Sequence, residues 1–379
     1  MAAGKGTRMK SRLPKVLQRL AGVPLVQHVL NMAALLNARS AVVITGHGAD
    51  QVEPLLLAPG QALSVQCVRQ EPQLGTGHAV QQAVPALPDD GVVVILSGDV
   101  PLTQADTLHA LIAQCGGDKL ALLTISFDDP TGYGRIVRGG AGPADAVHAI
   151  VEHKDATDAQ RLIKEVYSGI MAVPARWLKN WLARIDNHNA QGEYYLTDVV
   201  KLAVSDGVPV VAHQITDPLQ VAGINSPVQL AELERAHQLR QAHRFMEQGV
   251  RLKDPARFDL RGQLDCAQDV EIDVNCIFEG RVSLGEGVKI GANCVLANCT
   301  IAAGAVIHPF THIDGEKLGV SVGEGALIGP FARLRPGAQL GAEVHIGNFV
   351  EVKNSTMAKG AKANHLAYLG DATVGERVN

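Results

Sequence analysis

The chain contains 379 residues, of which 46% are hydrophobic and 19% charged, and its formal net charge at pH 7 is −4. This composition excludes an intrinsically disordered chain, and the small negative charge argues against an extended nucleic-acid surface. No run of about 18 apolar residues indicates a membrane-spanning helix, and the six cysteines form no Cys-x-x-Cys pair. We therefore expect a soluble cytoplasmic protein with reduced thiols and no membrane or nucleic-acid partner.

Residues 1–225 alternate apolar, strand-like runs with helical patterns. Residues 25–36 carry the apolar spacing of a helix, and residues 41–44 and 92–96 are aliphatic runs of the kind that parallel sheets bury on both faces. This alternation predicts an α/β domain with a three-layer, Rossmann-like sheet. In such sheets ligands bind at the carboxyl ends of the strands.

A helix is expected next. Ser226-Pro227 combines a capping side chain with proline at the first helical position. Leu230, Leu233 and Leu239 continue as an apolar stripe, and Gly249 suits the end of a helix. We expect a linker helix over 226–249 between a domain at 1–225 and a second domain at 250–379.

Apolar residues recur every six positions through the last third of the chain. They are Ile272, Phe278, Leu284, Ile290 and Leu296, then Ile301, Ile307 and Ile313, and finally Val322, Ile328, Leu334, Leu340, Ile346 and Val352. This period fits neither a helix nor a series of hairpins, but it fits one short strand and a tight turn per hexad. We predict a left-handed parallel β-helix with three hexads per coil and these side chains stacked inside.

Loops of the first domain carry residues suited to a nucleotide. Gly4-Lys5-Gly6-Thr7 can hold phosphates with backbone N–H groups, and Lys15 can neutralise their charge. Leu74-Gly75-Thr76-Gly77 leads into a helix and suits base or ribose contacts, and the turn-rich residues 128–135 can close over a substrate. Ser97-Gly98-Asp99 follows a buried strand and places a carboxylate where Mg²⁺ on substrate phosphates is held. An ordinary turn, a solvated lysine and a helix-capping aspartate are the alternative interpretations.

Longer motifs run in order through the whole chain. They are AAGKGTRM (2–9), LPK (13–15), QLGTGHA (73–79), GDVPL (98–102), DDPTGYGRI (128–136), VEHKDAT (151–157), QGEYYLTD (191–198), ARFDLRG (256–262), IGPFARLRPGA (328–338) and GNFVEVK (347–353). With them the chain resembles the bifunctional bacterial N-acetylglucosamine-1-phosphate uridylyltransferase/glucosamine-1-phosphate N-acetyltransferase family. The resemblance implies UTP, N-acetylglucosamine 1-phosphate, glucosamine 1-phosphate and acetyl-CoA as substrates, Mg²⁺ as cofactor, and a homotrimer.

The resemblance implies a uridylyl-transfer site in the first domain. Its residues would be Ala2, Ala3, Gly4 and Lys15 at the UTP phosphates and Gln70, Gly75 and Thr76 at uracil. Ser97 and Gly98 would also bind UTP or the sugar phosphate, Asp99 and Asn225 would hold Mg²⁺, and Gly134 and Glu152 would contact the sugar. Lys15 would be catalytic, because it neutralises charge during in-line attack of the sugar phosphate on the α-phosphorus of UTP. The family's sugar-contacting Asn is Tyr167 here, so a phenol hydroxyl would bond the sugar instead.

The resemblance also implies an acetyl-transfer site on the β-helix. Arg335, Lys353, Tyr368 and Asn379 match residues that bind glucosamine 1-phosphate, and His365 matches the general base. The chemistry is consistent, because an amine must lose a proton as it attacks a thioester and an imidazole accepts one at neutral pH. Arg335 and Lys353 supply cationic donors for the phosphate. A surface histidine is the alternative interpretation of His365.

Two other functions fit the same folds. One is a hexose-1-phosphate nucleotidyltransferase whose β-helix is regulatory, and the presence of His365 with Arg335 and Lys353 counts against it. The other is a non-catalytic assembly subunit, which the joint presence of Lys15, Asp99 and Asn225 disfavours.

The ends of the chain carry a further expectation. The phosphate loop follows Met1 directly, and the last repeat stops at Asn379. We therefore expect both ends to be shortened and the phosphate loop to lack a buried anchor. Uridylyl transfer would then be weak, and acetyl transfer would need coils beyond Asn379.

Overall fold

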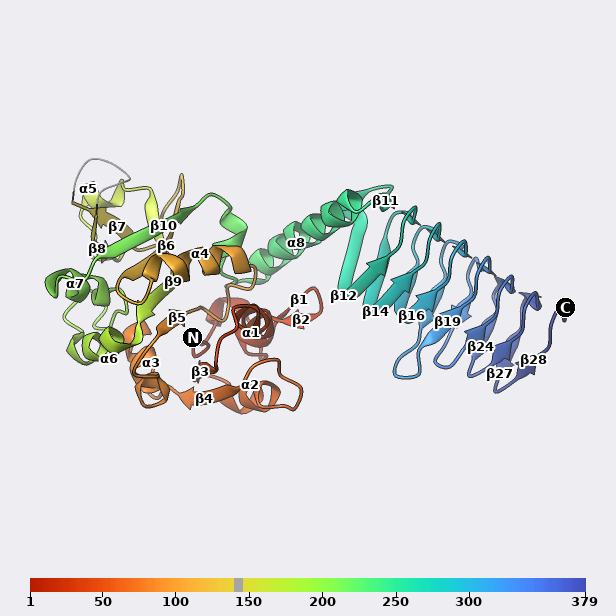
Figure 1. Cartoon of the computed structure of the whole chain (residues 1–379), viewed down its shortest axis with the longest axis horizontal. Helices are drawn as coiled ribbons and strands as arrows, with labels where there is room; N and C mark the ends of the chain where they lie inside the picture. Colours follow the sequence, from red (N-terminus) through yellow and green to blue (C-terminus); the bar gives the residue numbers. More distant parts are fainter. Residues whose placement is uncertain (140–145) are drawn as a thin grey trace. The chain divides into compact units, whose positions relative to one another are not determined.

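The computed structural model describes residues 1–139 and 146–379 and separates into two compact units (Figure 1). The first contains Met1–Arg19 and Pro24–Leu233, and the second contains Leu20–Val23 and Glu234–Asn379. The division falls inside a helix, so the domain boundaries at 225 and 249 stay predictions. Across the described ranges, no helix combines the length and apolarity needed to span a membrane.

The first unit alternates helices and strands as the sequence predicts. Its elements are η1 (Thr7–Met9), η2 (Lys15–Leu17), α1 (Leu25–Leu35), β3 (Ala41–Thr45), α2 (Ala49–Leu56), β4 (Val65–Arg69), α3 (Thr76–Ala83), η3 (Val84–Ala86), β5 (Val92–Ile95), α4 (Ala105–Cys115), β6 (Leu120–Ser126), β7 (Arg135–Arg138), β8 (Val147–Val151), α5 (Asp158–Arg161), β9 (Glu165–Pro174), α6 (Ala175–Arg184), α7 (Asp198–Ser205), β10 (Val210–Ile215) and η4 (Pro218–Val221). The short strands β1 (Arg19–Leu20) and β2 (Val23–Pro24) pair with each other, and each is divided between the two units.

The main sheet of the first unit has the order β10-β6-β9-β7-β8, with β5 also paired to β9. Among the described strands of this sheet only β10 and β6 pair in parallel, whereas β9 runs antiparallel to β5, β6 and β7. The parallel arrangement that we expected for residues 92–96 therefore holds only in part. Strand β5 runs antiparallel to β9, whereas Met1 N donates to Leu96 O at 2.7 Å and Met1 O accepts from Gly98 N at 2.8 Å, which is the bond pattern of a parallel neighbour. Strands β3 and β4 do form a parallel pair.

Alternate residues of β6 enter two separate apolar clusters. Leu120 and Leu122 pack in a cluster that includes Leu178 and Trp181 of α6. Ala121 and Leu123 belong to another, which includes Leu108 and Leu111 of α4. Since successive side chains of a strand point to opposite faces, helices cover both faces of the sheet. This confirms the predicted three-layer α/β architecture.

The first three residues form hydrogen bonds on both sides. The N–H of Ala2 donates to Ile44 O of β3 at 2.8 Å, and Met1 O accepts from Gly98 N at 2.8 Å. Ala2 and Ala3 are 5% and 7% exposed. The expectation that the phosphate loop lacks a buried anchor is therefore wrong, because backbone bonds to β3 and to the loop after β5 hold this buried segment.

The predicted helix is present as α8 (Pro227–Glu247). Ser226 caps it, because Ser226 Oγ accepts a hydrogen bond from Gln229 N at 3.2 Å. Proline at the first helical position has no N–H to leave unsatisfied there. Gly249 follows at φ +95°, a conformation that favours glycine after a helix.

A parallel β-solenoid follows, as the hexads predict (Figure 1). Its elements are β11 (Arg251–Leu252), η5 (Pro255–Arg257), β12 (Phe258–Cys266), β13 (Glu271–Ile272), β14 (Cys276–Leu284), β15 (Lys289–Ile290), β16 (Val295–Ile301), β17 (Val306–Ile307), β18 (His312–Asp314), β19 (Val320–Val322), β20 (Leu327–Ile328), β21 (Arg333–Leu334), β22 (Gln339–Leu340), β23 (His345–Asn348), β24 (Glu351–Lys353), β25 (Thr356–Met357), β26 (Lys362–His365), β27 (Tyr368–Gly370) and β28 (Thr373–Val374).

The strand register confirms three hexads per coil. Ile272 pairs with Ile290, Ile290 with Ile307, and Ile307 with Ile328, so that each residue meets its equivalent three hexads later. Every member of the six-residue series is buried in one core, with at most 3% of its surface exposed. Stacked aliphatic side chains therefore hold successive coils together.

Candidate active sites

Three residues that are far apart in the sequence meet in the first unit. Lys15 begins η2, Asp99 follows β5, and Asn225 precedes α8. Lys15 Nζ donates to Asp99 Oδ2 at 2.5 Å and to Asn225 Oδ1 at 3.1 Å. The side chains of Lys15 and Asp99 are 13% and 20% exposed. Two side-chain oxygen atoms thus lie within hydrogen-bond distance of one ammonium group.

The segments that carry these residues are tied to one another by backbone bonds. Ile224 N donates to Asp99 O at 3.0 Å, which fixes the residue before Asn225. A Cβ on Gly98 would lie 3.0 Å from Met1 O, so the two segments approach closely. A Cβ on Gly4 would meet nothing within 4 Å. The loop at Gly4 therefore borders open space, and two residues further on a Cβ on Gly6 would lie 2.7 Å from Lys15 Cβ.

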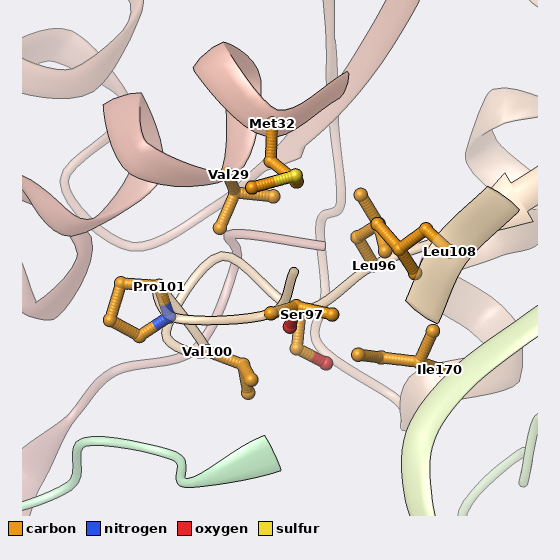
Figure 2. A pocket seen from close by; sticks show the side chains of 9 residues that line it. Val29, Met32, Leu96, Ser97, Val100, Pro101, Leu108 and Ile170 are labelled. Atoms are coloured by element: carbon orange, nitrogen blue, oxygen red, sulfur yellow. The ribbon is translucent and has the colours of Figure 1, made fainter. Parts of the chain in front are cut away.

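A small cavity lies next to Ser97 (Figure 2). Its volume is about 10 Å³, and apolar side chains line most of it, among them Met32, Leu96, Val100 and Ile170. This is close to the minimum for one water molecule and far below the size of a nucleotide. We assign the cavity to imperfect packing behind the loop of Asp99.

The residues expected at uracil gather at the start of α3. Gln70 is 4% exposed, and its Nε2 donates to Gly75 O at 2.9 Å. Gly75 has φ +110°, and a Cβ there would lie 2.6 Å from Tyr194 O, so only glycine fits. Thr76 Oγ1 accepts from Leu196 N at 3.1 Å. Gln73 Nε2 donates to Ala3 O, which joins this loop to the phosphate loop.

The residues expected at the sugar also meet. Tyr167 N donates to Gly134 O at 2.9 Å, and a Cβ on Gly134 would lie 3.6 Å from Glu152 Oε1. Glu152 accepts a hydrogen bond from Thr197 Oγ1 at 3.0 Å. The sequence alone assigned no role to Thr197, although it lies inside the motif QGEYYLTD. Glu152 also borders a pocket of about 370 Å³.

Burial shapes the electrostatics of this group. It raises the pKa of Glu152, an effect that the hydrogen bond from Thr197 opposes. It also raises the pKa of Tyr167, and the charge of Glu152 adds to this rise. The Tyr167 hydroxyl is buried and has no hydrogen-bond partner among the described residues. A neutral donor and a carboxylate thus lie near each other without bonding directly.

On the solenoid, the residues expected at the acetyl acceptor lie on successive coils. Arg335 follows β21, Lys353 ends β24 and Tyr368 begins β27, and these strands are neighbours in one ladder. Arg335 Nη1 donates to Glu351 Oε1 at 2.7 Å, and this bond raises the pKa of Arg335.

His365 is exposed at the end of β26, opposite Asn348. Its neighbour Asn364 donates from Nδ2 to Asn379 Oδ1 at 2.9 Å. The expected general base thus lies on a different sheet of the solenoid from β21, β24 and β27, although Tyr368 begins the next strand along the chain, and its imidazole is accessible to a ligand.

A column of exposed apolar side chains follows one corner of the solenoid. Phe310, Phe331 and Phe349 stack in turn, with ring centroids 5.0 Å and 5.4 Å apart. They are 52%, 47% and 58% exposed, and Leu366 beside His365 is 77% exposed. We call these four residues the corner column.

Comparison with known proteins decides the family. A model described as a MobA-like NTP transferase domain matches residues 1–251, and a bacterial transferase hexapeptide model with six repeats matches residues 319–354. A Paracidovorax citrulli protein named "Bifunctional protein GlmU" is 74% identical over 388 residues, covering 100% of this chain and 81% of that protein. The protein of the same name from Azoarcus sp. is 54% identical over 379 residues, with coverages of 100% and 81%.

The chain belongs to the GlmU family. GlmU membership confirms the resemblance found in the motifs and joins a nucleotidyltransferase domain to hexapeptide repeats in one enzyme. A solved structure, "The Crystal Structure of UDP-glucose pyrophosphorylase complexed with UDP-glucose", has a TM-score of 0.50 and 16% identity, covering 62% of this chain and 96% of that one. At this identity it supports the nucleotidyltransferase fold of the GlmU chain and nothing further.

Proposed function

We propose that this enzyme makes UDP-N-acetylglucosamine in two steps. Acetyl transfer from acetyl-CoA to glucosamine 1-phosphate gives N-acetylglucosamine 1-phosphate. Uridylyl transfer from UTP then gives the product and releases pyrophosphate. The observation that carries the second step is the convergence of Lys15, Asp99 and Asn225, because a cation and two oxygen donors at one point suit a metal-bound triphosphate.

Uridylyl transfer needs positioning and charge neutralisation more than covalent chemistry. The backbone of Ala2, Ala3 and Gly4 faces the phosphates, and Lys15 neutralises negative charge as the sugar phosphate attacks the α-phosphorus. For this, Lys15 Nζ exchanges Asp99 for a phosphate oxygen. The low exposure of Lys15 makes that charge effective, since water screens it little.

Nucleotidyl transfer of this class uses a divalent metal, and we propose Mg²⁺ held by Asp99 and Asn225. Their oxygens both lie within hydrogen-bond distance of the single atom Lys15 Nζ, so one small cation can reach both. Among the described residues no cluster of three His, Cys, Asp or Glu side chains can hold a metal alone. This suits Mg²⁺, which keeps waters and substrate oxygens among its ligands and supplies charge stabilisation at the phosphates.

We propose that the uracil and the sugar are contacted by two different groups of residues. Gln70, Gly75 and Thr76 are proposed to recognise uracil, because they are fixed by their own hydrogen bonds at the start of α3. At the sugar, a hydroxyl can donate to Glu152 and accept from Tyr167, which gives the buried Tyr167 hydroxyl the partner that it lacks among the described residues.

On the solenoid we propose His365 as the base that takes a proton from the attacking amine. Arg335 and Lys353 bind the acceptor's phosphate, with Tyr368 and Asn379 beside them. Glu351 holds Arg335 in place, so the guanidinium is oriented before the phosphate arrives.

We also propose a cytoplasmic homotrimer. The exposed corner column supports assembly, because three stacked rings in contact with water favour burial against another surface. Light scattering tests this: replacing Phe310, Phe331 and Phe349 with Ser should leave a monomer. A trimer that persists would place the subunit contact elsewhere.

The function is tested by pyrophosphate release from UTP and N-acetylglucosamine 1-phosphate with Mg²⁺. Glucose 1-phosphate in place of the acetylated sugar is the control. A preference for the acetylated sugar supports the proposal, and equal rates would favour a general hexose-1-phosphate nucleotidyltransferase. No release with either sugar would favour a non-catalytic subunit.

A further inference from the structure

Arg135, the first residue of β7, is buried in an unusual state. It is 1% exposed, and no carboxylate among the described residues lies within ion-pair distance of it. Its Nε also has no hydrogen-bond partner in the described part of the chain. Its two other nitrogens are engaged: Nη1 donates to Tyr133 O, and Nη2 bonds to Nδ1 of His153 at 3.2 Å.

Such a residue does not favour folding. An ion taken out of water without an opposite charge loses its hydration and gains little in return, and apolar side chains in its place are often more stable. Burial accordingly lowers the pKa of Arg135, although the charge of Asp129 opposes this. Arg135 therefore needs an explanation other than the stability of the core.

The two hydrogen bonds of Arg135, to Tyr133 O and His153 Nδ1, supply this explanation. Tyr133 directly precedes Gly134, and His153 directly follows Glu152, so each bond holds the neighbour of a residue proposed at the sugar. The turn before Gly134 is itself ordered, because Tyr133 N donates to Pro130 O at 3.2 Å. The Tyr133 ring also packs against Phe127 at 5.2 Å.

We propose that Arg135 is a positioning residue for the sugar phosphate: it ties the loop of Gly134 to the segment after β8 that contains Glu152 and His153. The inference rests on the proposed function, since it takes Gly134 and Glu152 as the sugar contacts. Without the tie, the loop before β7 moves relative to β8, and the sugar is held less well, whereas the uracil contacts on α3 are unaffected.

The experiment compares Arg135→Met, Arg135→Lys and Arg138→Met in the full chain. Arg138 lies on the same strand but has a bidentate partner in Glu165, at 2.8 Å. We expect Arg135→Met to raise the KM for N-acetylglucosamine 1-phosphate roughly 10- to 100-fold, with the KM for UTP changed less than about twofold and the melting temperature unchanged or higher. Arg135→Lys should recover part of the loss. Arg138→Met should lower the melting temperature and leave the sugar KM unchanged.

A second variant covers the case in which Arg135→Met does not fold. His153→Phe keeps a ring but removes the acceptor for Nη2, and should raise the sugar KM in the same selective way. Hydrogen exchange of residues 128–134 should increase in both variants while exchange in β6 does not. This readout decides the inference even if the parent enzyme shows no uridylyl transfer, a result that would contradict only the proposed function. An unchanged sugar KM, an equal rise for both substrates, or unchanged loop exchange would overturn the inference.

Discussion

Nζ of Lys15 lies 2.5 Å from Oδ2 of Asp99. The carboxylate is therefore neutralised by a lysine before any substrate binds, and the ion pair is largely shielded from water. An ion pair with this little exposure forms before a substrate binds. A divalent metal ion nevertheless offers Asp99 a stronger opposite charge, and a triphosphate offers Lys15 one. We therefore expect Lys15 and Asp99 to give up their contact with each other when the proposed metal and triphosphate bind.

Replacing Asp99 with Ala should reduce uridylyl transfer by about 100-fold or more, since it removes the proposed charged metal ligand and the partner of Lys15. The solenoid should stay folded, because Asp99 belongs to the other unit. Initial rates at saturating Mg²⁺ and circular dichroism measure the two effects. Asp90→Ala, at an exposed aspartate, is the control. Near-normal turnover of Asp99→Ala would remove Asp99 from the site.

Lys15→Ala should lower kcat more than it raises the KM for UTP, because a cation that faces developing phosphate charge acts mainly in the transition state. Steady-state kinetics with UTP as the varied substrate separate the two constants, and Lys10→Ala, at an exposed lysine, is the control. A change confined to KM would show that Lys15 binds UTP without assisting the chemistry.

Tyr167→Phe should raise the stability of the free enzyme and weaken sugar binding. The buried hydroxyl has no partner among the described residues, and removing an unsatisfied polar group recovers about 1 kcal/mol or more. The same change removes the proposed bond to the sugar, so the KM for N-acetylglucosamine 1-phosphate should increase. Thermal melting and kinetics measure these opposite effects. A lower melting temperature would mean that the hydroxyl has a partner in the folded protein.

Glu152 should make stability fall as pH rises. Its pKa in the folded protein is raised above the ordinary value of 4.5 by burial. Its contribution is fully present below pH 4.5 and is lost as pH rises through the folded pKa, because the buried carboxyl must then ionise. Glu152→Gln removes this loss, so the melting temperature of the variant minus that of the parent should increase from pH 4.5 upward and then level off. A difference that does not vary with pH would contradict the shift.

His365→Ala should lower acetyl transfer roughly 10²- to 10⁴-fold, the usual contribution of a general base. Uridylyl transfer should not change, because His365 lies in the other unit. Thiol release from acetyl-CoA with glucosamine 1-phosphate measures the effect. His345→Ala, on the neighbouring strand β23, is the control. Equal rates in both variants and the parent would leave the base unassigned.

The solenoid could be predicted from the sequence because each six-residue repeat places one apolar side chain inside. A side chain such as Ile290 or Ile328 has one inward position per hexad, so periodicity predicts burial directly. The strand partners in the first unit were not readable in this way, since an aliphatic run such as 92–96 does not show whether its neighbour is parallel. Backbone bonds at Ala2 leave no mark on side-chain pattern either.

The candidate site likewise contains residues that the sequence could predict and residues that it could not. Lys15 is a polar residue at the start of η2, Asp99 and Asn225 are polar residues after β5 and before α8, and the fold brings the three side chains into contact. Thr197 and Arg135 lie inside the motifs QGEYYLTD and DDPTGYGRI, but the motifs assigned neither residue a role of its own. Their roles depend on which backbone or carboxylate atoms lie opposite them, and only the three-dimensional arrangement supplies that information.

In most repeats the register of the strands depends on a fixed number of residues per repeat. The loop between β18 and β19 is an exception. Ile313 and Val322 lie nine positions apart instead of six, yet both remain in register with their neighbouring coils. The additional residues leave the ladder at the corner, where Gly315 lies too close to Asn298 O for any side chain. A corner of this solenoid is thus a point at which sequence can be added without shifting the register of the later coils. Peptides or reporter groups grafted between Glu316 and Leu318 should be carried by an undisturbed scaffold.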